Sequence, residues 1–572
     1  MSERAQTKTE VESVAEAYLE LLAARGIDYF FGNGGTDFAP IVEAYAKRFN
    51  KEQVLPHPIP VPHEMTAVAM AYGYTMVTGK PQVVMVHTLP GTANASNGVF
   101  LASRSNIPML FTAGRTPLTE GDTLASRDLS IHWAQESFDQ GAMVREWVKW
   151  DYELRHGADL ENVVDRALAI TQSEPAAPVY LTLPREILAE GMDSITYSDK
   201  PRVQKTGETA PAPEAIAEVA QALAGAKSPM LVTRAIGKDP RAMQPLIELA
   251  ELLGMPVFDA GGYYVNFPKN HPLHAGGDVA ATLSEADVVV VAEADVPWIP
   301  NRTGPRPDAT VIGLGVDPLY SKYAVRGFQV DMNLPGSPRL TLGALVQAVK
   351  EIGVDTAAAK ARTEKWASAG EQRRNEMRER AEAGKDQTPI NKAWFTSQLA
   401  KHLNENTILL NELGVDLTQI EFNHPGTYYS GGPAGALGWA IGASLGAKLA
   451  APDKTVIACV GDGSYIFGSG TAGHIVSDSQ GIPVLTIVWN NGIWNAVQNA
   501  TRVTYGQGTA VEFNNFAITT LSQKFRYEAI CQAAGGYGER VDDPAEVSGA
   551  IERALKAVQV EKRQALLNII GQ

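Results

Sequence analysis

The sequence predicts an α/β protein built from three doubly wound parallel-sheet domains. Helical patterns alternate with short apolar strands along the chain, which is typical of βαβ units. The strands are continuous apolar runs such as VVMV, MLFT and VYLTL, as expected when helices cover both faces of a parallel sheet. At 572 residues, the chain is also too long for a single hydrophobic core.

The first domain is expected at residues 1–190. A helix at 11–24 precedes strands at 29–32, 81–87, 108–113 and 179–183. Residues 193–213 are polar and contain prolines, which is the composition of a linker.

The second domain is expected at 214–354, with strands at 230–232, 257–258, 288–291 and 311–313. Residues 357–384 are rich in Lys, Arg, Glu and Ala and predict an exposed connecting helix. The third domain is expected at 391–572, with strands at 408–411, 456–460 and 484–488. The first and third domains could be related folds that have diverged.

Composition excludes several kinds of partner. The net charge of -15 disfavours nucleic acid and anionic membranes, and no run of about 18 apolar residues predicts a membrane span. Cys459 and Cys531 are the only cysteines, too few for a disulfide framework or a four-cysteine zinc site. The start of the chain lacks the basic and apolar regions of a secretion signal. We therefore expect a cytoplasmic protein that acts on a small molecule.

Two polar motifs follow predicted strands of the third domain. The strand TVIACV runs into Gly461, Asp462, Gly463 and Ser464. The strand PVLTIVW runs into Asn490, Asn491 and Gly492, with 26 residues between Gly463 and Asn490. The carboxyl edge of a parallel sheet is where ligands bind, and carboxylate and carboxamide oxygens suit Mg²⁺ bound to a diphosphate. Flanking glycines let backbone N–H groups approach phosphate oxygens.

This spaced pair of motifs resembles the signature of thiamine diphosphate enzymes. The resemblance implies that Asp462 and Asn491 bind Mg²⁺ through their side chains and Ile493 through its carbonyl oxygen. It also implies that the three domains are a pyrimidine-binding, a central and a diphosphate-binding domain.

The segment GGPAGALGWAIGASLGAKLA is similar to the family segment that lies under the thiazolium ring. By this resemblance, Leu437 would hold the two cofactor rings in a V, and the Gly435 carbonyl would accept the 4'-amino hydrogen. A helix rich in Gly and Ala that packs closely on a sheet would explain the same segment. Glu412 and Gly414, which follow the strand at 408–411, are further candidate cofactor-binding residues.

Thiamine chemistry requires a carboxylic acid at N1' of the aminopyrimidine. Glu64 begins an apolar helical segment and matches the family residue with this role. Read alone, it would more often complement the helix dipole. The family builds each site from the first domain of one subunit and the third domain of another. The resemblance therefore implies at least a homodimer, and usually a homotetramer.

The resemblance is strongest to the group of acetolactate synthases, benzoylformate decarboxylases and 2-hydroxyacyl-CoA lyases. Thr36, in GNGGTD, occupies the position of a decarboxylase serine. His87, in VHTLPGTAN, occupies the position of a decarboxylase histidine, which could relay protons near the substrate. His87 could equally be a residue that caps a strand end. Gln135 is a candidate donor to a substrate carbonyl or carboxylate, and His271 a candidate second histidine, although synthases carry HP there without that role.

These residues predict a thiamine diphosphate and Mg²⁺ dependent lyase or carboligase that acts on 2-oxo acids by decarboxylation, acyloin formation or both. The alternatives are a 2-hydroxyacyl-CoA lyase, a flavin-dependent oxidase of the pyruvate oxidase type, and a non-catalytic cofactor-binding protein. Bound FAD or ADP is doubtful, because LVTRAIGKD lacks the glycine turn usual in the nucleotide-binding members. The short segment after the last predicted strand offers no basic tail for a CoA phosphate, which argues against acyl-CoA.

Overall fold

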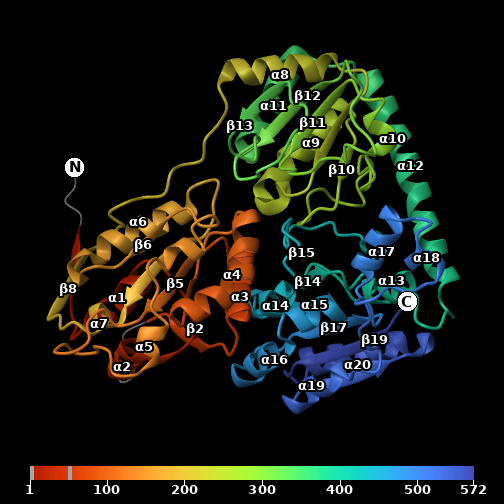
Figure 1. Ribbon diagram of the computed structural model, residues 1–572. Helices are drawn as coiled ribbons and strands as arrows, with labels where there is room; N and C mark the ends of the chain where they lie inside the picture. Colours follow the sequence, from red (N-terminus) through yellow and green to blue (C-terminus); the bar gives the residue numbers. More distant parts are fainter. Residues whose placement is uncertain (1–4, 49–54) are drawn as a thin grey trace.

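The computed structural model describes residues 5–48 and 55–572. In this part of the chain the strands form three parallel sheets and one antiparallel ribbon, so the predicted α/β class with three parallel-sheet domains is confirmed. Figure 1 shows the N-terminal domain in red to orange, the central domain in green at the top and the C-terminal domain in blue.

The N-terminal sheet has six parallel strands. Their order is β3 (His57–Pro60), β2 (Tyr29–Asn33), β4 (Val83–Val86), β5 (Leu110–Arg115), β7 (Val179–Pro184) and β6 (Asp151–Glu153). The helices are α1 (Val14–Ala24), α2 (Ala39–Arg48), α3 (Glu64–Thr78), α4 (Thr88–Arg104), α5 (Ile131–Ala134), α6 (Leu160–Gln172) and α7 (Arg185–Ala189). Val84 and Val86 of β4 face one hydrophobic core, and Val83 and Met85 face another. This alternation confirms that both faces of the sheet are covered.

The linker expected at 193–213 begins with a strand instead. Strand β8 (Ser194–Ser198) pairs antiparallel with β1 (Gln6–Glu10), so the N-terminal domain extends beyond its expected end. Ile195 and Tyr197 alternate with exposed or partly exposed residues and are buried against that domain, where the Tyr197 hydroxyl donates to Glu20. Residues 199–212 contain neither helix nor strand and form the remaining connection.

The central sheet has five parallel strands. Their order is β10 (Val257–Asp259), β9 (Pro229–Thr233), β11 (Val288–Ala292), β12 (Thr310–Gly315) and β13 (Met332–Pro335). The helices are α8 (Pro213–Gly225), α9 (Met243–Leu253), α10 (Ala280–Leu283) and α11 (Pro338–Ile352). The run VVVVA of β11 is buried throughout, as expected of a central strand covered on both faces.

The C-terminal sheet has six parallel strands in the order β15 (Tyr428–Ser430), β14 (Thr407–Glu412), β16 (Thr455–Gly461), β17 (Leu485–Asn490), β19 (Ala565–Ile570) and β18 (Tyr537–Val541). Its helices are α13 (Lys392–Ala400), α14 (Trp439–Ala450), α15 (Asp462–Phe467), α16 (Gly470–Ser479), α17 (Asn495–Thr504), α18 (Thr509–Glu512), α19 (Tyr527–Ala533) and α20 (Val547–Gln559). Counted along each domain, the N-terminal and C-terminal sheets share the order 2-1-3-4-6-5. In both, the order reverses between the first and third strands, which is where such sheets bind ligands.

The N-terminal and C-terminal domains meet through helices α3 and α14, which lie side by side in Figure 1. Glycines allow backbone to touch backbone. A Cβ on Gly446 would lie 1.9 Å from the Met70 carbonyl oxygen, and one on Gly73 would lie 2.1 Å from that of Ala443. One hydrophobic core runs continuously through this contact and includes buried residues of both domains.

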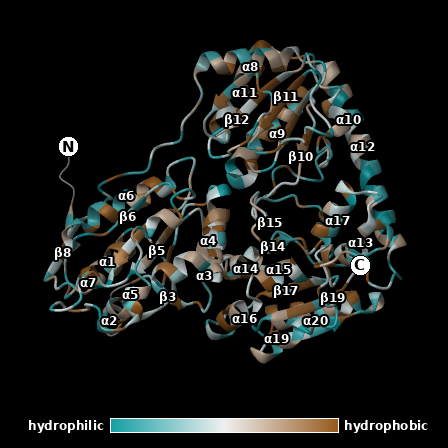
Figure 2. Ribbon diagram, in the orientation of Figure 1, coloured by the Kyte–Doolittle hydropathy of each residue, from teal (hydrophilic) through white to brown (hydrophobic). Residues whose placement is uncertain are grey.

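Helix α12 (Thr356–Ala383) joins the central and C-terminal domains, as predicted. The Asp355 side chain caps its start by accepting a hydrogen bond from the Ala358 N–H. Figure 2 shows this helix mainly in teal and white, while the strands of the sheets are brown. Within the described ranges, no helix is both long and apolar enough to cross a membrane.

We expect Gly446→Ala to destabilise the protein by about 1–3 kcal/mol, because its methyl group would collide with the backbone of α3. Gly343→Ala is the matched control. Gly343 lies inside α11, and its new Cβ would meet nothing within 4 Å. This control should be neutral or stabilising by up to about 1 kcal/mol. Thermal melts of the two variants test the α3–α14 contact, and equal shifts in Tm would contradict it.

Candidate active site

The two polar motifs of the C-terminal domain are held together at adjacent strand ends. Gly461 of β16 pairs with Trp489 of β17, so both strands end at the same edge of the sheet. The Asp462 carboxylate accepts N–H groups from Gly463 at 2.9 Å and from Gly492 at 2.8 Å. Asp462 therefore links the first motif directly to the second.

Asp462 and its surroundings fit a divalent cation. Its side chain is only 3% exposed, and burial raises the pKa of its carboxyl group. A bound cation would reverse this effect by favouring the carboxylate. The Asn491 carboxamide oxygen accepts the Ile493 N–H at 3.1 Å, which folds the second loop into a turn. Carboxylate, carboxamide and backbone carbonyl are the oxygen donors that Mg²⁺ prefers.

Several glycines and one serine shape this edge of the sheet. Gly492 has a φ of +70°, which favours glycine, and a Cβ on Gly463 would lie 2.2 Å from the Trp494 ring. A Cβ on Gly414 would lie 2.4 Å from the backbone of Cys459. Gly461 is partly buried at the end of β16, and Ser464 is buried in α15.

Glu412 fixes the loop that precedes α14. It is the last residue of β14, and its carboxylate accepts N–H groups from Gly438 at 2.6 Å and from Ala440 at 2.8 Å. Burial raises the pKa of Glu412 to about 7, although these hydrogen bonds oppose the shift. The loop carries Gly435, which is exposed, and Leu437, whose carbonyl accepts a hydrogen bond from Asn97 of α4.

Glu64 is the first residue of α3, and its side chain is partly exposed. The Asn94 carboxamide of α4 donates to the Glu64 carboxylate at 2.5 Å. Asn94 was not among the predicted site residues, although it ends the motif VHTLPGTAN that singled out His87. The pair lies at the carboxyl edge of the N-terminal sheet, where α3 and α4 begin after β3 and β4.

His87 lies at the start of α4, directly after β4. Its Nδ1 is 2.5 Å from the carboxylate of Asp37, a buried residue that sequence reasoning missed. The hydrogen bond to Asp37 raises the pKa of His87 despite the opposing effect of burial, and Gln135 contributes to the same shift. The Gln135 side-chain oxygen is buried without a hydrogen-bond partner in the described part of the chain. This oxygen can only accept a hydrogen bond, for which His87 is the neighbouring donor, whereas the amide N–H₂ of Gln135 is the group that could donate to a ligand oxygen.

Thr36 lies beside a second histidine. Its hydroxyl is 3.4 Å from Nε2 of His132, which in turn is 3.5 Å from the Arg185 guanidinium. Burial and the nearby charge of Arg185 lower the pKa of His132. Arg185 also pairs with Asp128, while its Nε is buried and has no partner among the described residues. Arg185 follows β7 directly, so its position after a predicted strand could have identified it.

His271 does not join this group in the structure of the single chain. It lies in the central domain, where its Nε2 is 3.2 Å from Glu251 and its ring packs edge-on against Phe267. These contacts hold His271 beside α9, and its catalytic role stays a prediction.

Each of the three domains matches a protein-family model. Residues 12–143 match the N-terminal TPP binding domain of thiamine pyrophosphate enzymes, residues 216–345 match the central domain, and residues 413–569 match the C-terminal TPP binding domain. Thiamine pyrophosphate is another name for thiamine diphosphate. The chain belongs to the thiamine diphosphate-dependent enzyme superfamily.

Similarity to individual superfamily members is low but covers nearly their whole length. A benzoylformate decarboxylase of Pseudomonas aeruginosa is 26% identical, over 96% of this chain and 97% of that protein. A sulfoacetaldehyde acetyltransferase of Rhodobacter capsulatus is 26% identical, over 97% and 94% respectively. The crystal structure of benzoylformate decarboxylase from Polynucleobacter necessarius superposes with a TM-score of 0.76, at 20% identity, over 97% of this chain and 98% of that chain.

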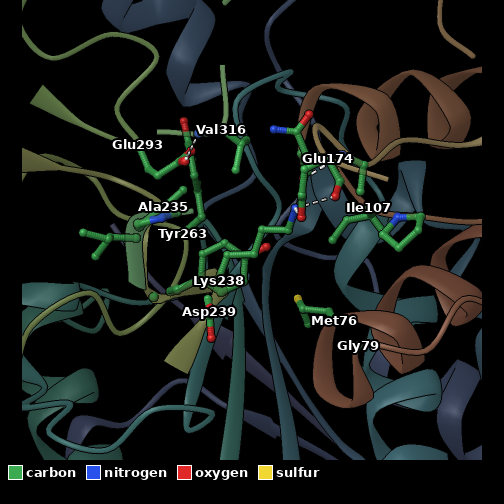
Figure 3. Close-up of a pocket in the computed structure, with 18 of the residues that line it drawn as sticks. Met76, Gly79, Ile107, Glu174, Ala235, Lys238, Asp239, Tyr263, Glu293 and Val316 are labelled. Atoms are coloured by element: carbon green, nitrogen blue, oxygen red, sulfur yellow. Dashed lines mark hydrogen bonds and ion pairs between the residues drawn. The ribbon is translucent and has the colours of Figure 1, made fainter. Parts of the chain in front are cut away.

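A separate cleft of about 580 Å³ lies where the three domains of this superfamily member meet. Figure 3 shows Met76 and Ile107 on one side and Tyr263 and Glu293 on the other. Glu293 accepts the Val316 N–H at 2.8 Å, and burial raises its pKa to about 7. The cleft lies at the carboxyl edge of the central sheet, next to the turn after β9.

That turn has no free backbone donors for a phosphate. The N–H groups of residues 235–238 donate to the Glu293 carbonyl, the Thr233 hydroxyl, the Asn266 carboxamide and the Ala235 carbonyl. With these N–H groups already used, the turn is a poor site for a nucleotide phosphate.

We expect Asp462→Asn to weaken the binding of thiamine diphosphate in the presence of Mg²⁺ by roughly 100-fold or more, since it removes a negatively charged cation ligand. Asp453→Asn is the matched control, because Asp453 is exposed just before the other end of β16. Isothermal titration calorimetry of both variants measures the change. Similar affinities in the two variants would contradict the predicted metal site, as would full cofactor binding in EDTA.

Proposed function

We propose that the protein is a thiamine diphosphate and Mg²⁺ dependent lyase or carboligase that acts on 2-oxo acids. The observation that carries this proposal is the hydrogen bond from the Gly492 N–H to Asp462, which unites the two halves of the cation site. In the superfamily, the bound cofactor supplies a nucleophilic carbon and stabilises the negative charge left when a bond to a carbonyl carbon breaks.

The residues of this chain have separate roles in the proposal. Asp462, Asn491 and the Ile493 carbonyl hold Mg²⁺, while Gly461, Gly463, Ser464, Gly492, Glu412 and Gly414 shape the diphosphate site. Gly435 and Leu437 contact the rings of the cofactor. Glu64 shares a proton with the aminopyrimidine, and Asn94 orients its carboxylate. His87 moves protons at the reacting carbon.

A 2-oxo acid brings a carboxylate and a carbonyl oxygen, both of which need donors. Thr36 and Gln135 lie next to the two histidines and are the proposed contacts. Arg185 adds a positive charge that contacts His132. These groups favour an anionic substrate over an uncharged one.

Exposed apolar side chains support a dimer. Phe467 is 55% exposed and Leu413 is 60% exposed near the cation site, while Leu124 and Phe138 are exposed on the segment that precedes and follows α5. Apolar groups around two half-sites are typical of surfaces that meet in an assembly. We propose that the N-terminal domain of one subunit faces the C-terminal domain of another in a homodimer, two of which form a homotetramer. A cytoplasmic location stays a prediction.

The first experiment is product analysis by mass spectrometry with thiamine diphosphate, Mg²⁺ and a substrate panel. The panel contains pyruvate, benzoylformate, glyoxylate, simple aldehydes, and formyl-CoA with a ketone. We expect CO₂ release or acyloin formation from a 2-oxo acid. Product only from the CoA mixture would instead identify a 2-hydroxyacyl-CoA lyase. Yellow absorbance of the purified protein would favour the flavin-dependent oxidase.

Glu64→Gln should lower kcat by about 10²–10⁴-fold, because the amide cannot share a proton with the cofactor. Cofactor affinity should change little, because Gln keeps the size of the side chain and the proposed ligands Asp462, Asn491 and Ile493 still hold Mg²⁺ and the diphosphate. Calorimetry and turnover measured on the same preparation separate the two effects. Full activity in this variant would rule out the assigned role of Glu64. A turnover that falls with this substitution would also distinguish an enzyme from a non-catalytic binding protein.

A further inference from the structure

The buried Asp37 pairs with the partly exposed His87. Asp37 lies in a single helical turn after β2, with a side chain only 2% exposed, and its Oδ1 lies 2.5 Å from Nδ1 of His87. Within residues 5–48 and 55–572, no other residue hydrogen-bonds to this carboxylate, and its Oδ2 is buried without a partner. A buried carboxylate with one partner is costly unless that partner is charged.

Two glycines make room for the pair. A Cβ on Gly35 would lie 2.1 Å from Nδ1 of His87, and one on Gly114 would lie 1.7 Å from Oδ2 of Asp37. Any other residue at position 35 or 114 would push the imidazole and the carboxylate apart. The space around the pair is therefore built by three segments: the loop after β2, the start of α4, and β5.

The pair also fixes which nitrogen of His87 is available. Because Nδ1–H donates to Asp37, only Nε2 can exchange a proton with a substrate. The nearby His132 is the opposite case, since burial and Arg185 favour its neutral form. Neighbouring groups whose pKa values are moved apart by their surroundings are typical of divided acid and base roles.

We propose that Asp37 is a positioning residue that keeps His87 protonated and directs its Nε2–H toward the reacting carbon. This inference rests on the proposed function. During decarboxylation of a 2-oxo acid, the bond between the carboxylate carbon and the carbonyl carbon breaks and CO₂ leaves. The electron pair of that bond stays on the carbonyl carbon, which takes the proton from Nε2 and is released as an aldehyde, and solvent protonates Nε2 again.

The charged groups that face His87 come from three elements. Asp37 lies on the turn after β2, Glu64 on α3 and His132 on α5; Asp37 and Glu64 favour the imidazolium, and a charged His132 would oppose it. Gln135 also contacts His87 but carries no charge. An acid of this kind works below its pKa and loses activity as the pH rises through it. Asp37 therefore extends activity to higher pH.

The test replaces Asp37 by Asn in the holoenzyme, which keeps an acceptor for Nδ1–H but removes the charge. Hydrogen–deuterium exchange at the imidazole C2, read by mass spectrometry across pH, follows His87 and His132 in one sample. We expect the midpoint of His87 to fall by about one pH unit. The pH at which kcat declines on the alkaline side of its profile should fall by the same amount. The exchange midpoint of His132 should change far less.

Asp128→Asn is the matched control, because Asp128 lies 3.2 Å from Nδ1 of His132 and should affect only that histidine. In a His87→Gln background, Asp37→Asn should cause no further change in the pH profile. An unchanged His87 midpoint in Asp37→Asn would overturn the proposal, as would an effect that persists without His87. If no 2-oxo acid is turned over, the proposed function fails, but the exchange measurement still decides whether Asp37 controls His87.

Discussion

The arrangement of the molecule depends on the backbone contact between helices α3 and α14. Glycines at 73 and 446 let the two helices approach more closely than side chains allow, and the hydrophobic core then continues from one domain into the other. The same helices begin at the functional edge of each sheet. Glu64 opens α3, while the loop with Gly435 and Leu437 precedes α14. A change in this contact would therefore move the segments proposed to bind the cofactor in both domains together.

The second constraint is the carboxyl edge of each parallel sheet. The N-terminal and C-terminal sheets share a strand order, and in both the polar residues collect where that order reverses. The C-terminal edge carries the oxygen acceptors of the proposed cation site, whereas the N-terminal edge carries two histidines whose pKa values are shifted. The central sheet has a reversal as well, but its turn uses all of its N–H groups internally and presents a buried carboxylate. The same kind of strand order thus presents different polar groups at the carboxyl edge of each domain, because the residues after the strands differ.

The sequence predicted the buried centre of each sheet better than the edges. Runs such as VVMV and VIACV have no charged residue and predict buried strands, whereas β3 is HPIP and β8 is SITYS, neither of which forms an apolar run. The candidate residues that follow central strands, such as Asp462 and His87, were predicted for the same reason. Asp37 was missed because the prediction singled out its neighbour Thr36. The sequence does not indicate that the Asp37 side chain turns inward toward His87. His271 was predicted from its neighbours in sequence alone, whereas its partner Glu251 lies on helix α9, about twenty residues earlier in the chain.

Burial affects the acids of the two edges in different ways. Asp462 and Glu412 are both buried, and their carboxylates accept backbone N–H groups, but burial still raises the pKa of each, so the backbone dipoles only partly offset the cost of a buried charge. Asp37 is equally buried, but its hydrogen bond comes from an imidazole that can itself carry a charge. Neutralising Asp462 requires an ion from solution, whereas Asp37 is neutralised within the domain. The proposed metal site would therefore be completed only when a cation binds, whereas the Asp37–His87 pair is already formed within the N-terminal domain. On the proposed mechanism, the acid is thus in place before the cofactor binds.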